Sequence, residues 1–236
     1  MIIAAVVVLY LAYELSVFAY KYYHLPVLPS IDLSDETLGS GPALTYVAAG
    51  DSTGVGYGAS SEKGTYTYKI AEFLAKDHSV EYKNVSVSGA ETGDILKAQV
   101  PQIIALKPDV ITISMGANDA THLVATKKIL DNYKAIIGAL ERGTSAKIYI
   151  TDIPNFTGAT ILPWFYDLFL EYRSGQINPR LLALADRRVK MVNIHDSGWS
   201  TPPYNDRAAT YAADYFHPND LGYQNWANAF LDVIKN

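Results

Sequence analysis

The chain has 236 residues, of which 49% are hydrophobic and 18% are charged, so we expect one domain with a substantial core and exclude global disorder. A net charge of -5, without a cluster of lysine and arginine, argues against a nucleic-acid-binding protein. Because the chain has no cysteine, disulfides, thiolate nucleophiles and cysteine-based zinc sites are excluded as well.

The first part of the chain is a separate apolar segment. Residues 2–20 are almost wholly apolar, interrupted only by Glu14 and Ser16. As a helix this segment would be about 28 Å long, close to the hydrocarbon thickness of a bilayer. Its isoleucine, valine, leucine and phenylalanine side chains would contribute about -3 to -6 kcal/mol to insertion, and a carboxylate near the middle would cost about 2.5 to 3.5 kcal/mol. Insertion into a membrane is therefore favoured by a small margin.

This apolar segment has three interpretations. We favour a membrane anchor over residues 1–22, with the rest of the chain on the extracytoplasmic side. A cleaved secretory signal is the second interpretation, but no lysine or arginine precedes Lys21 and the run ends without a clear cleavage site. The third is a helix packed on the folded domain. Residues 23–42 carry prolines, serines and acids without a sustained period, so we expect a linker there and one domain over residues 43–236.

From residue 43 onward, short apolar runs alternate with segments of helical spacing. The runs expected to be strands are residues 44–49, 80–87, 109–115, 147–151 and 189–194. The segments expected to be helices are residues 64–76, 92–106, 129–140, 162–172, 177–187 and 220–234. Strands separated by helices pair in parallel through right-handed crossovers. The sequence therefore predicts an α/β fold, a three-layer α/β/α sandwich around a mostly parallel five-stranded sheet, with ligands bound at the carboxyl ends of the strands.

A glycine-rich turn, GDSTGVGYGAS over residues 50–60, directly follows the first of these strands. Gly54, Gly56 and Ala59 fit the dinucleotide pattern G-x-G-x-x-A, but the second strand ends in NVSVSG without the acid that would hold a ribose. Residues 50–54 also fit the G-x-S-x-G elbow of α/β-hydrolases. That elbow needs an upstream strand and loop for its oxyanion hole, and the first strand of this domain leaves no room for them.

The third interpretation makes Ser52 a nucleophile, which requires a histidine base and an orienting acid. His217 lies three residues after Asp214 and just before the last expected helix. A carboxylate at this spacing can reach Nδ1 of the imidazole, so that Nε2 faces the serine. The alternative is that Asp214 and His217 only cap the last helix. His122 and His195 also follow strands, and their positions alone do not exclude them as bases.

Donors for a developing oxyanion are expected on the neighbouring strand ends. Asn118, in SMGANDATH after the third strand, carries a side-chain amide that can donate. Gly89, in SVSGAETGD after the second strand, can offer its backbone N–H, and Ser52 can offer its own. Each such donor is typically worth about 10²- to 10³-fold in rate. Taken alone, the Asn-Asp pair at residues 118–119 would indicate only a turn.

These motifs, in this order from residue 44 to the C-terminus, resemble those of the SGNH (GDSL-type) hydrolase superfamily. The stretch ALKPDVITISMGAND is also similar to the bacterial lysophospholipase and thioesterase-like branch. Thr53 departs from the leucine of the family name, at a position that varies. The resemblance implies a flavodoxin-like sheet and ester hydrolysis without a metal or other cofactor. The roles it implies are Ser52 as nucleophile, His217 as base, Asp214 as its orienter, and Ser52, Gly89 and Asn118 as the oxyanion hole.

The resemblance leaves the substrate open. We expect hydrolysis of short-to-medium acyl esters or lysophospholipid-like esters through an acyl-enzyme, with deacetylation of carbohydrates as the alternative. An inactive binding module on the same scaffold is the alternative from another class. The aromatic stretch at residues 155–172 could be a lid, an acyl-binding wall or buried core. Neither the oligomeric state nor the balance between hydrolysis and acyl transfer can be inferred from these residues.

Overall fold

The computed structural model describes residues 2–200 and 209–236. Its centre is a six-stranded sheet that begins at one edge with β1 (Glu36–Leu38) and continues in the order β3, β2, β4, β5 and β6. Five strands are parallel: β3 (Ser79–Asn84), β2 (Ala43–Gly50), β4 (Val110–Ser114), β5 (Lys147–Thr151) and β6 (Val189–Val192). Every residue of β4 is buried, as expected for a central strand covered on both faces. The five predicted strands are therefore confirmed.

The sheet has one strand more than expected. β1 (Glu36–Leu38) comes from the segment expected to be a linker and pairs antiparallel with β3, Glu36 opposite Tyr82. Three residues are too few to show the alternation of a strand in sequence, so β1 is recognised only from its pairing with the edge of β3. The Lys83 ammonium, 2.7 Å from an Asp35 carboxylate oxygen, fixes the segment on that edge. β1 thus covers a strand edge that would otherwise be open to pairing with another chain.

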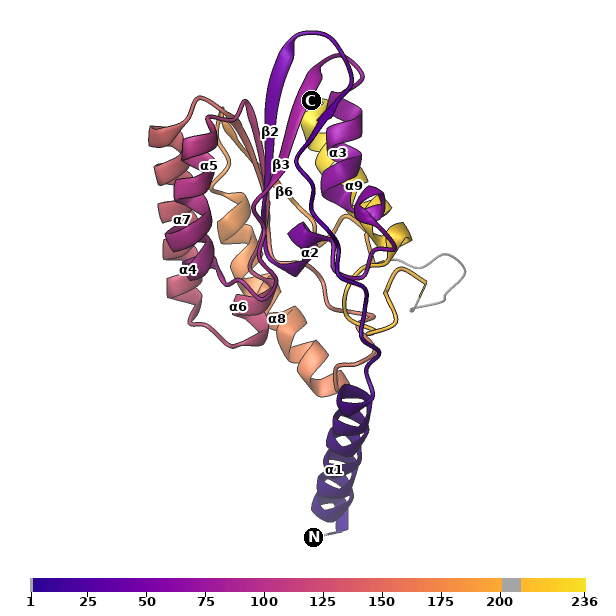
Figure 1. Cartoon of the computed structure of the whole chain (residues 1–236). Helices are drawn as coiled ribbons and strands as arrows, with labels where there is room; N and C mark the ends of the chain where they lie inside the picture. Colours follow the sequence, from indigo (N-terminus) through magenta and orange to yellow (C-terminus); the bar gives the residue numbers. More distant parts are fainter. Residues whose placement is uncertain (1, 201–208) are drawn as a thin grey trace.

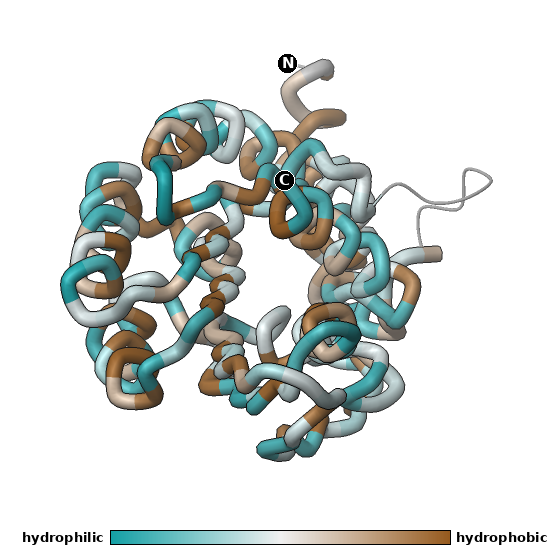
Figure 2. The backbone as a smooth tube through the Cα atoms, turned by 90° about the horizontal axis from the view of Figure 1, so that it is seen from above, coloured by the Kyte–Doolittle hydropathy of each residue, from teal (hydrophilic) through white to brown (hydrophobic). Residues whose placement is uncertain are grey.

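Helices cover both faces of the sheet, which confirms the three-layer sandwich. α3 (Tyr66–Leu74) and α9 (Asp220–Ile234) lie on one face, and α5 (Val100–Leu106), α7 (Thr126–Gly143) and α8 (Trp164–Leu182) lie on the other (Figure 1). Figure 2 shows hydrophilic and hydrophobic residues alternating along these helices, as expected when one side faces a core. The first core is aromatic, with the rings of Tyr66 and Phe230 stacked 5.1 Å apart, whereas the second is mostly aliphatic.

Two helical segments differ from the expectation. Residues 162–172 and 177–187, expected as two helices, form the single helix α8, which contains Pro179. Buried Leu170, Ile177 and Leu181 hold both halves of α8 against the same core, so the helix continues despite the proline. Residues 92–106 begin with α4 (Thr92–Asp94), widen into a π-helical turn, η2 (Ile95–Gln99), and continue as α5.

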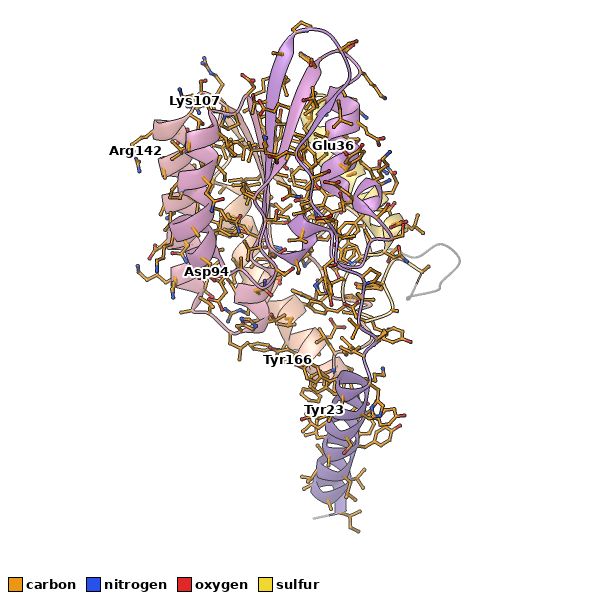
Figure 3. All side chains as sticks on the ribbon, in the orientation of Figure 1. Tyr23, Glu36, Asp94, Lys107, Arg142 and Tyr166 are labelled. Carbon is orange, nitrogen blue, oxygen red and sulfur yellow. The ribbon has the colours of Figure 1, made fainter. Side chains whose placement is uncertain are left out.

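α1 (Ile2–Tyr23) lies outside the sandwich. Among the described residues, it contains the one segment long and apolar enough to cross a membrane, Ala4–Tyr23. Figure 1 shows α1 extending from the side of the sheet on which α2 (Ser52–Val55), α6 (Ala117–Thr121) and the start of α8 lie. In Figure 3, Tyr23 and Tyr166 mark this end of the molecule, and Lys107 and Arg142 mark the opposite end. The helix therefore emerges on the side where the strands carry their carboxyl ends.

Candidate active site

The turn after β2 is held in place by the neighbouring strand β4. Gly50 has a φ of +138°, and a Cβ atom there would lie 2.1 Å from the Ser114 carbonyl oxygen, so only glycine fits. The next residue, Asp51, donates its N–H to the same oxygen at 3.1 Å and caps α2. Ser52 therefore begins a helix at the carboxyl end of a central strand.

The carboxylate of Asp51 organises the first turn of α2. It accepts hydrogen bonds from the Thr53 N–H at 2.9 Å and the Thr53 hydroxyl at 2.7 Å. Burial raises the pKa of the Asp51 carboxyl, although the two bonds from Thr53 oppose the rise. The Thr53 hydroxyl also lies 2.8 Å from the Ser114 hydroxyl. Thr53, where the family name has leucine, is thus a buried polar link between this turn and β4.

The structure brings Ser52, His217 and Asp214 together. The Ser52 Oγ lies 2.9 Å from His217 Nε2, and His217 Nδ1 lies 2.6 Å from Asp214 Oδ2. The other oxygen of Asp214 accepts the N–H groups of Phe216 and His217, both at 3.0 Å. The cap of α9 is Asn219, which accepts hydrogen bonds from the first turn of that helix. Asp214 and His217 are therefore not the helix cap that the alternative interpretation required.

The electrostatics of this trio favour one tautomer of the histidine. Burial by itself raises the pKa of Asp214, but the hydrogen bonds from His217 and Phe216 outweigh it and leave that pKa below its usual value. An ionised Asp214 can only accept, so it favours the tautomer with the N–H on His217 Nδ1, and Nε2 then faces the Ser52 hydroxyl. The imidazole is held between two rings, Tyr57 at 4.8 Å and Phe216 at 5.1 Å, both nearly perpendicular to it. The sequence analysis did not single out either ring.

Asn118, in α6, borders the same pocket as Ser52 and His217. Its amide nitrogen donates to the Ala90 carbonyl at 3.0 Å, and the second N–H of the amide is available for another acceptor. Gly89 directly precedes Ala90, is exposed, and has a φ of +79°. The direction of the Gly89 N–H is not given by any contact, so its role as an oxyanion donor stays a prediction.

A buried acid joins α6, which carries Asn118, to the start of α4 (Thr92–Asp94), which follows Gly89 and Ala90 in the chain. Asp119, fully buried, accepts the Thr92 N–H at 2.9 Å and the Thr92 hydroxyl at 2.6 Å. Asn132 in turn donates to the Thr92 hydroxyl at 2.8 Å. Burial raises the pKa of Asp119 and the bonds from Thr92 oppose this rise. The Asn-Asp pair is therefore more than a turn, because Asp119 fixes the position from which Asn118 extends.

The pocket at Ser52 has mostly apolar walls. Aromatic and small side chains form them, namely Phe156, Ala159, Trp199, Tyr211, Phe216 and Trp226. Phe156, from the aromatic stretch at residues 155–172, is buried and stacks on Phe216 with ring centres 6.2 Å apart. Trp164 and Tyr172 of the same stretch are instead exposed. Buried core and surface are thus both present in this stretch.

Comparison with known proteins identifies the family. Residues 48–224 match the GDSL-like Lipase/Acylhydrolase family, which is most of the chain. The chain belongs to this family. An arylesterase from Vibrio mimicus is 31% identical over 140 residues, covering 56% of this chain and 68% of that protein. The resemblance stated from the motifs is therefore confirmed, and the chain is a carboxylic ester hydrolase.

Solved structures agree with the fold of the hydrolase. TesA superposes with a TM-score of 0.64 at 19% identity, covering 81% of this chain and 98% of that one. The lipase Lip_vut3 from a goat rumen metagenome superposes with a TM-score of 0.61 at 23% identity, covering 80% and 96%. An acetyl xylan esterase from Geobacillus stearothermophilus gives 0.59 at 20% identity, covering 84% and 96%. At these identities the likeness shows the shared α/β architecture.

The two remaining histidines that follow strands have other partners in the hydrolase. His122 Nδ1 lies 2.9 Å from Glu91 on the surface, and His195 lies between Asp196 at 2.9 Å and Glu171 at 3.1 Å. Asp152, at the end of β5, accepts the His195 N–H, and its burial raises the pKa of its carboxyl to about 7. Within residues 2–200 and 209–236, no group of three or more histidine, aspartate or glutamate side chains is placed to hold a metal ion.

Proposed function

We propose that Ser52 is the nucleophile of a two-step ester hydrolysis. The observation that carries the proposal is the continuous hydrogen-bonded series from Ser52 Oγ through His217 to Asp214, at 2.9 and 2.6 Å. Such a series activates a hydroxyl that is otherwise a weak nucleophile near neutral pH.

In the first step the Ser52 oxygen attacks the carbonyl carbon of the ester while its proton passes to His217 Nε2. The carbonyl oxygen becomes an oxyanion, which accepts hydrogen bonds from the Asn118 amide and the backbone N–H groups of Gly89 and Ser52. The bond to the alcohol then breaks, and the alcohol oxygen takes the proton from His217. In the second step water gives a proton to His217, attacks the acyl carbon and releases the acid, and Ser52 regains its proton.

For the substrate we propose short-to-medium acyl esters or lysophospholipid-like esters. The support is the lining of the pocket, in which aromatic rings and small apolar side chains surround the few polar groups near Ser52. The Vibrio mimicus relative is described as an arylesterase, which agrees with an apolar substrate. Deacetylation of a carbohydrate is the alternative, and sustained turnover of acetylated xylan oligosaccharides in preference to p-nitrophenyl esters would favour it.

For the location we propose that α1 anchors the hydrolase in a membrane, with the catalytic domain on the extracytoplasmic side. Apart from Glu14 and Lys21, the helix carries no charged side chain, and most of its large apolar side chains are exposed. A cleaved secretory signal is the alternative, because the same length and composition would serve both purposes.

Replacement of the nucleophile tests the proposed mechanism. We expect Ser52→Ala to lower kcat/KM for p-nitrophenyl acetate by about 10³-fold or more, because both covalent steps require the hydroxyl. A fluorophosphonate probe should label the wild-type protein and leave Ser52→Ala unlabelled. Ser61→Ala is the matched control, because Ser61 is an exposed serine in the loop that follows α2. Undiminished hydrolysis by Ser52→Ala would contradict the mechanism.

A further inference from the structure

A groove with mostly apolar walls begins at the catalytic histidine and is closed on its far side by α1. Three of its residues, Asn118, Phe216 and His217, also line the pocket at Ser52, so the groove and the pocket are continuous. Ile161 and Leu162, from the loop before α8, add to the wall on the hydrolase domain. The opposite wall belongs to the N-terminal segment and consists of Phe18, Tyr22 and Leu25.

Direct contacts hold α1 against the hydrolase domain. The Lys21 ammonium donates to the Thr160 carbonyl at 2.6 Å, next to Ile161 in the groove. Further along the helix, the rings of Tyr10 and Trp164 lie 6.4 Å apart. Lys21 is one of only two charged side chains of α1, and this bond ties it to the protein rather than to solvent. The position of α1 next to the groove is therefore fixed at two points.

One side of α1 faces the domain and the rest is free. The partly covered side chains include Leu11, Glu14, Phe18 and Lys21, and their spacing of three and four residues places them on one face of the helix. Tyr13 and Tyr20, seven residues apart, lie on the opposite face and are 61% and 66% exposed. A helix that were only an anchor would need no such face, because any apolar side chain can contact lipid. The covered face indicates a second task for α1.

We propose that the last turns of α1 form one wall of a binding site for the unbranched hydrocarbon chain of the substrate. The ester carbonyl would lie at Ser52, and the chain would extend along the groove between Phe216 and Ile161 on one side and Phe18 on the other. This inference rests on the proposed function and narrows it to esters that carry such a chain. Each methylene group that leaves water for the groove should raise kcat/KM about two- to fourfold.

The walls of the groove fit a hydrocarbon chain better than a polar ligand. Away from the catalytic residues, the polar groups along it are the Tyr22 hydroxyl, His122, paired with Glu91 at 2.9 Å, and Thr121, whose hydroxyl is bonded to the Ala117 and Asn118 carbonyls. These few groups offer a sugar ring little to pair with its several hydroxyl groups, and burying a hydroxyl without a partner is unfavourable. A hydrocarbon chain has no polar group to satisfy.

The experiment measures how kcat/KM depends on chain length in the full-length protein in detergent micelles. One substrate series is p-nitrophenyl esters from acetate to dodecanoate, and a second is acetate esters of alcohols of increasing length. We expect kcat/KM of the wild type to rise with length in at least one series, and the series that rises identifies whether the acyl or the alcohol part occupies the groove. For the series that rises, the double variant Phe18→Ala/Tyr22→Ala should lower about tenfold the ratio of kcat/KM between its longest and its shortest ester.

Matched variants separate the groove from general effects on the helix. Tyr13→Ala/Tyr20→Ala removes a similar apolar area from exposed positions on the opposite face of α1, so its length dependence should equal that of the wild type. If Phe18→Ala/Tyr22→Ala is an active esterase on p-nitrophenyl acetate and keeps the full dependence of kcat/KM on chain length, the inference is overturned. A wild type that shows no length dependence in either series overturns it too. If no form of the protein hydrolyses p-nitrophenyl acetate, the proposed function has failed instead.

Discussion

The Asn118 amide has two N–H bonds, and the structure uses one of them on the Ala90 carbonyl. In the mechanism that we propose, the other binds the substrate oxygen, and this bond strengthens as negative charge develops in the transition state. We therefore expect Asn118→Ala to lower kcat for p-nitrophenyl acetate about 10²- to 10³-fold with little change in KM. Steady-state kinetics on the purified protein measures both values.

Asn155 provides a control for this prediction, because it lines the same pocket and its side-chain oxygen accepts the Thr157 N–H at 2.6 Å. Asn155→Ala should change kcat far less than Asn118→Ala, since Asn155 is assigned no contact with the developing charge. A higher KM at unchanged kcat in Asn118→Ala would mean that Asn118 only binds the ground state, contrary to the role proposed here.

At the residue scale, the pairing of Asp214 with His217 could be predicted from local spacing, whereas the choice of His217 as the partner of Ser52, 165 positions away, came from the family resemblance. Asp214 lies three positions from His217, and Ser52 lies in a motif directly after a strand. The link from Asp51 through Thr53 to Ser114 could not be predicted in this way, because it depends on the register in which Gly50 of β2 lies opposite Ser114 of β4. The ring of Tyr57 against His217 likewise results from tertiary packing.

At the scale of elements, the π-helical turn η2 has an identifiable purpose. Its last residue, Gln99, accepts the Gly50 N–H at 2.9 Å and donates to the Gly50 carbonyl at 2.8 Å, so one buried side chain binds both backbone groups of the residue that opens the turn of Ser52. We expect Gln99→Met, which has a similar shape, to leave the Gly50 N–H unpaired, whereas the Gly50 carbonyl keeps its bond from the Val87 N–H at 3.1 Å. The free energy of unfolding should fall by about 1 to 3 kcal/mol, measured by urea denaturation.

The same helical stretch supplies a control for Gln99. Gln102 lies three positions further along, at an exposed site, and Gln102→Met should leave the free energy of unfolding within about 0.5 kcal/mol of the wild type. Equal urea midpoints for Gln99→Met and the wild type would show that the two bonds to Gly50 contribute nothing to stability.

Strands and helices were predictable where apolar spacing extends over several residues. β4 is buried throughout and reads as an unbroken apolar run, and α7 shows a clear helical period. β1 has only three residues, and its position depends on the edge of β3. α8 was expected as two helices with a gap at residues 173–176, whereas the packing of Leu170, Ile177 and Leu181 on one core continues a single helix through this gap.

At the scale of the whole molecule, the central question is whether α1 remains part of the protein and inserts into a membrane. The margin for insertion is only a few kcal/mol, since Glu14 offsets part of the gain from the apolar side chains. A lysine on the exposed surface of α1 should remove that margin. Val8, 64% exposed, is a suitable position, because a lysine there costs about 2.5 to 3.5 kcal/mol of insertion without touching the groove.

We therefore expect the wild-type protein to stay with bacterial membranes after alkaline carbonate washing and Val8→Lys to be released in large part. Val27→Lys, just beyond α1 and 97% exposed, is the control and should remain bound. Protease added to spheroplasts should digest the catalytic domain, because we propose that it lies on the extracytoplasmic side.

The intact mass of the purified protein distinguishes an anchor that is retained from a signal that is cleaved. Loss of the first 20 or so residues would identify a cleaved signal, and since Phe18 would leave with them, the mature groove would lack part of its α1 wall.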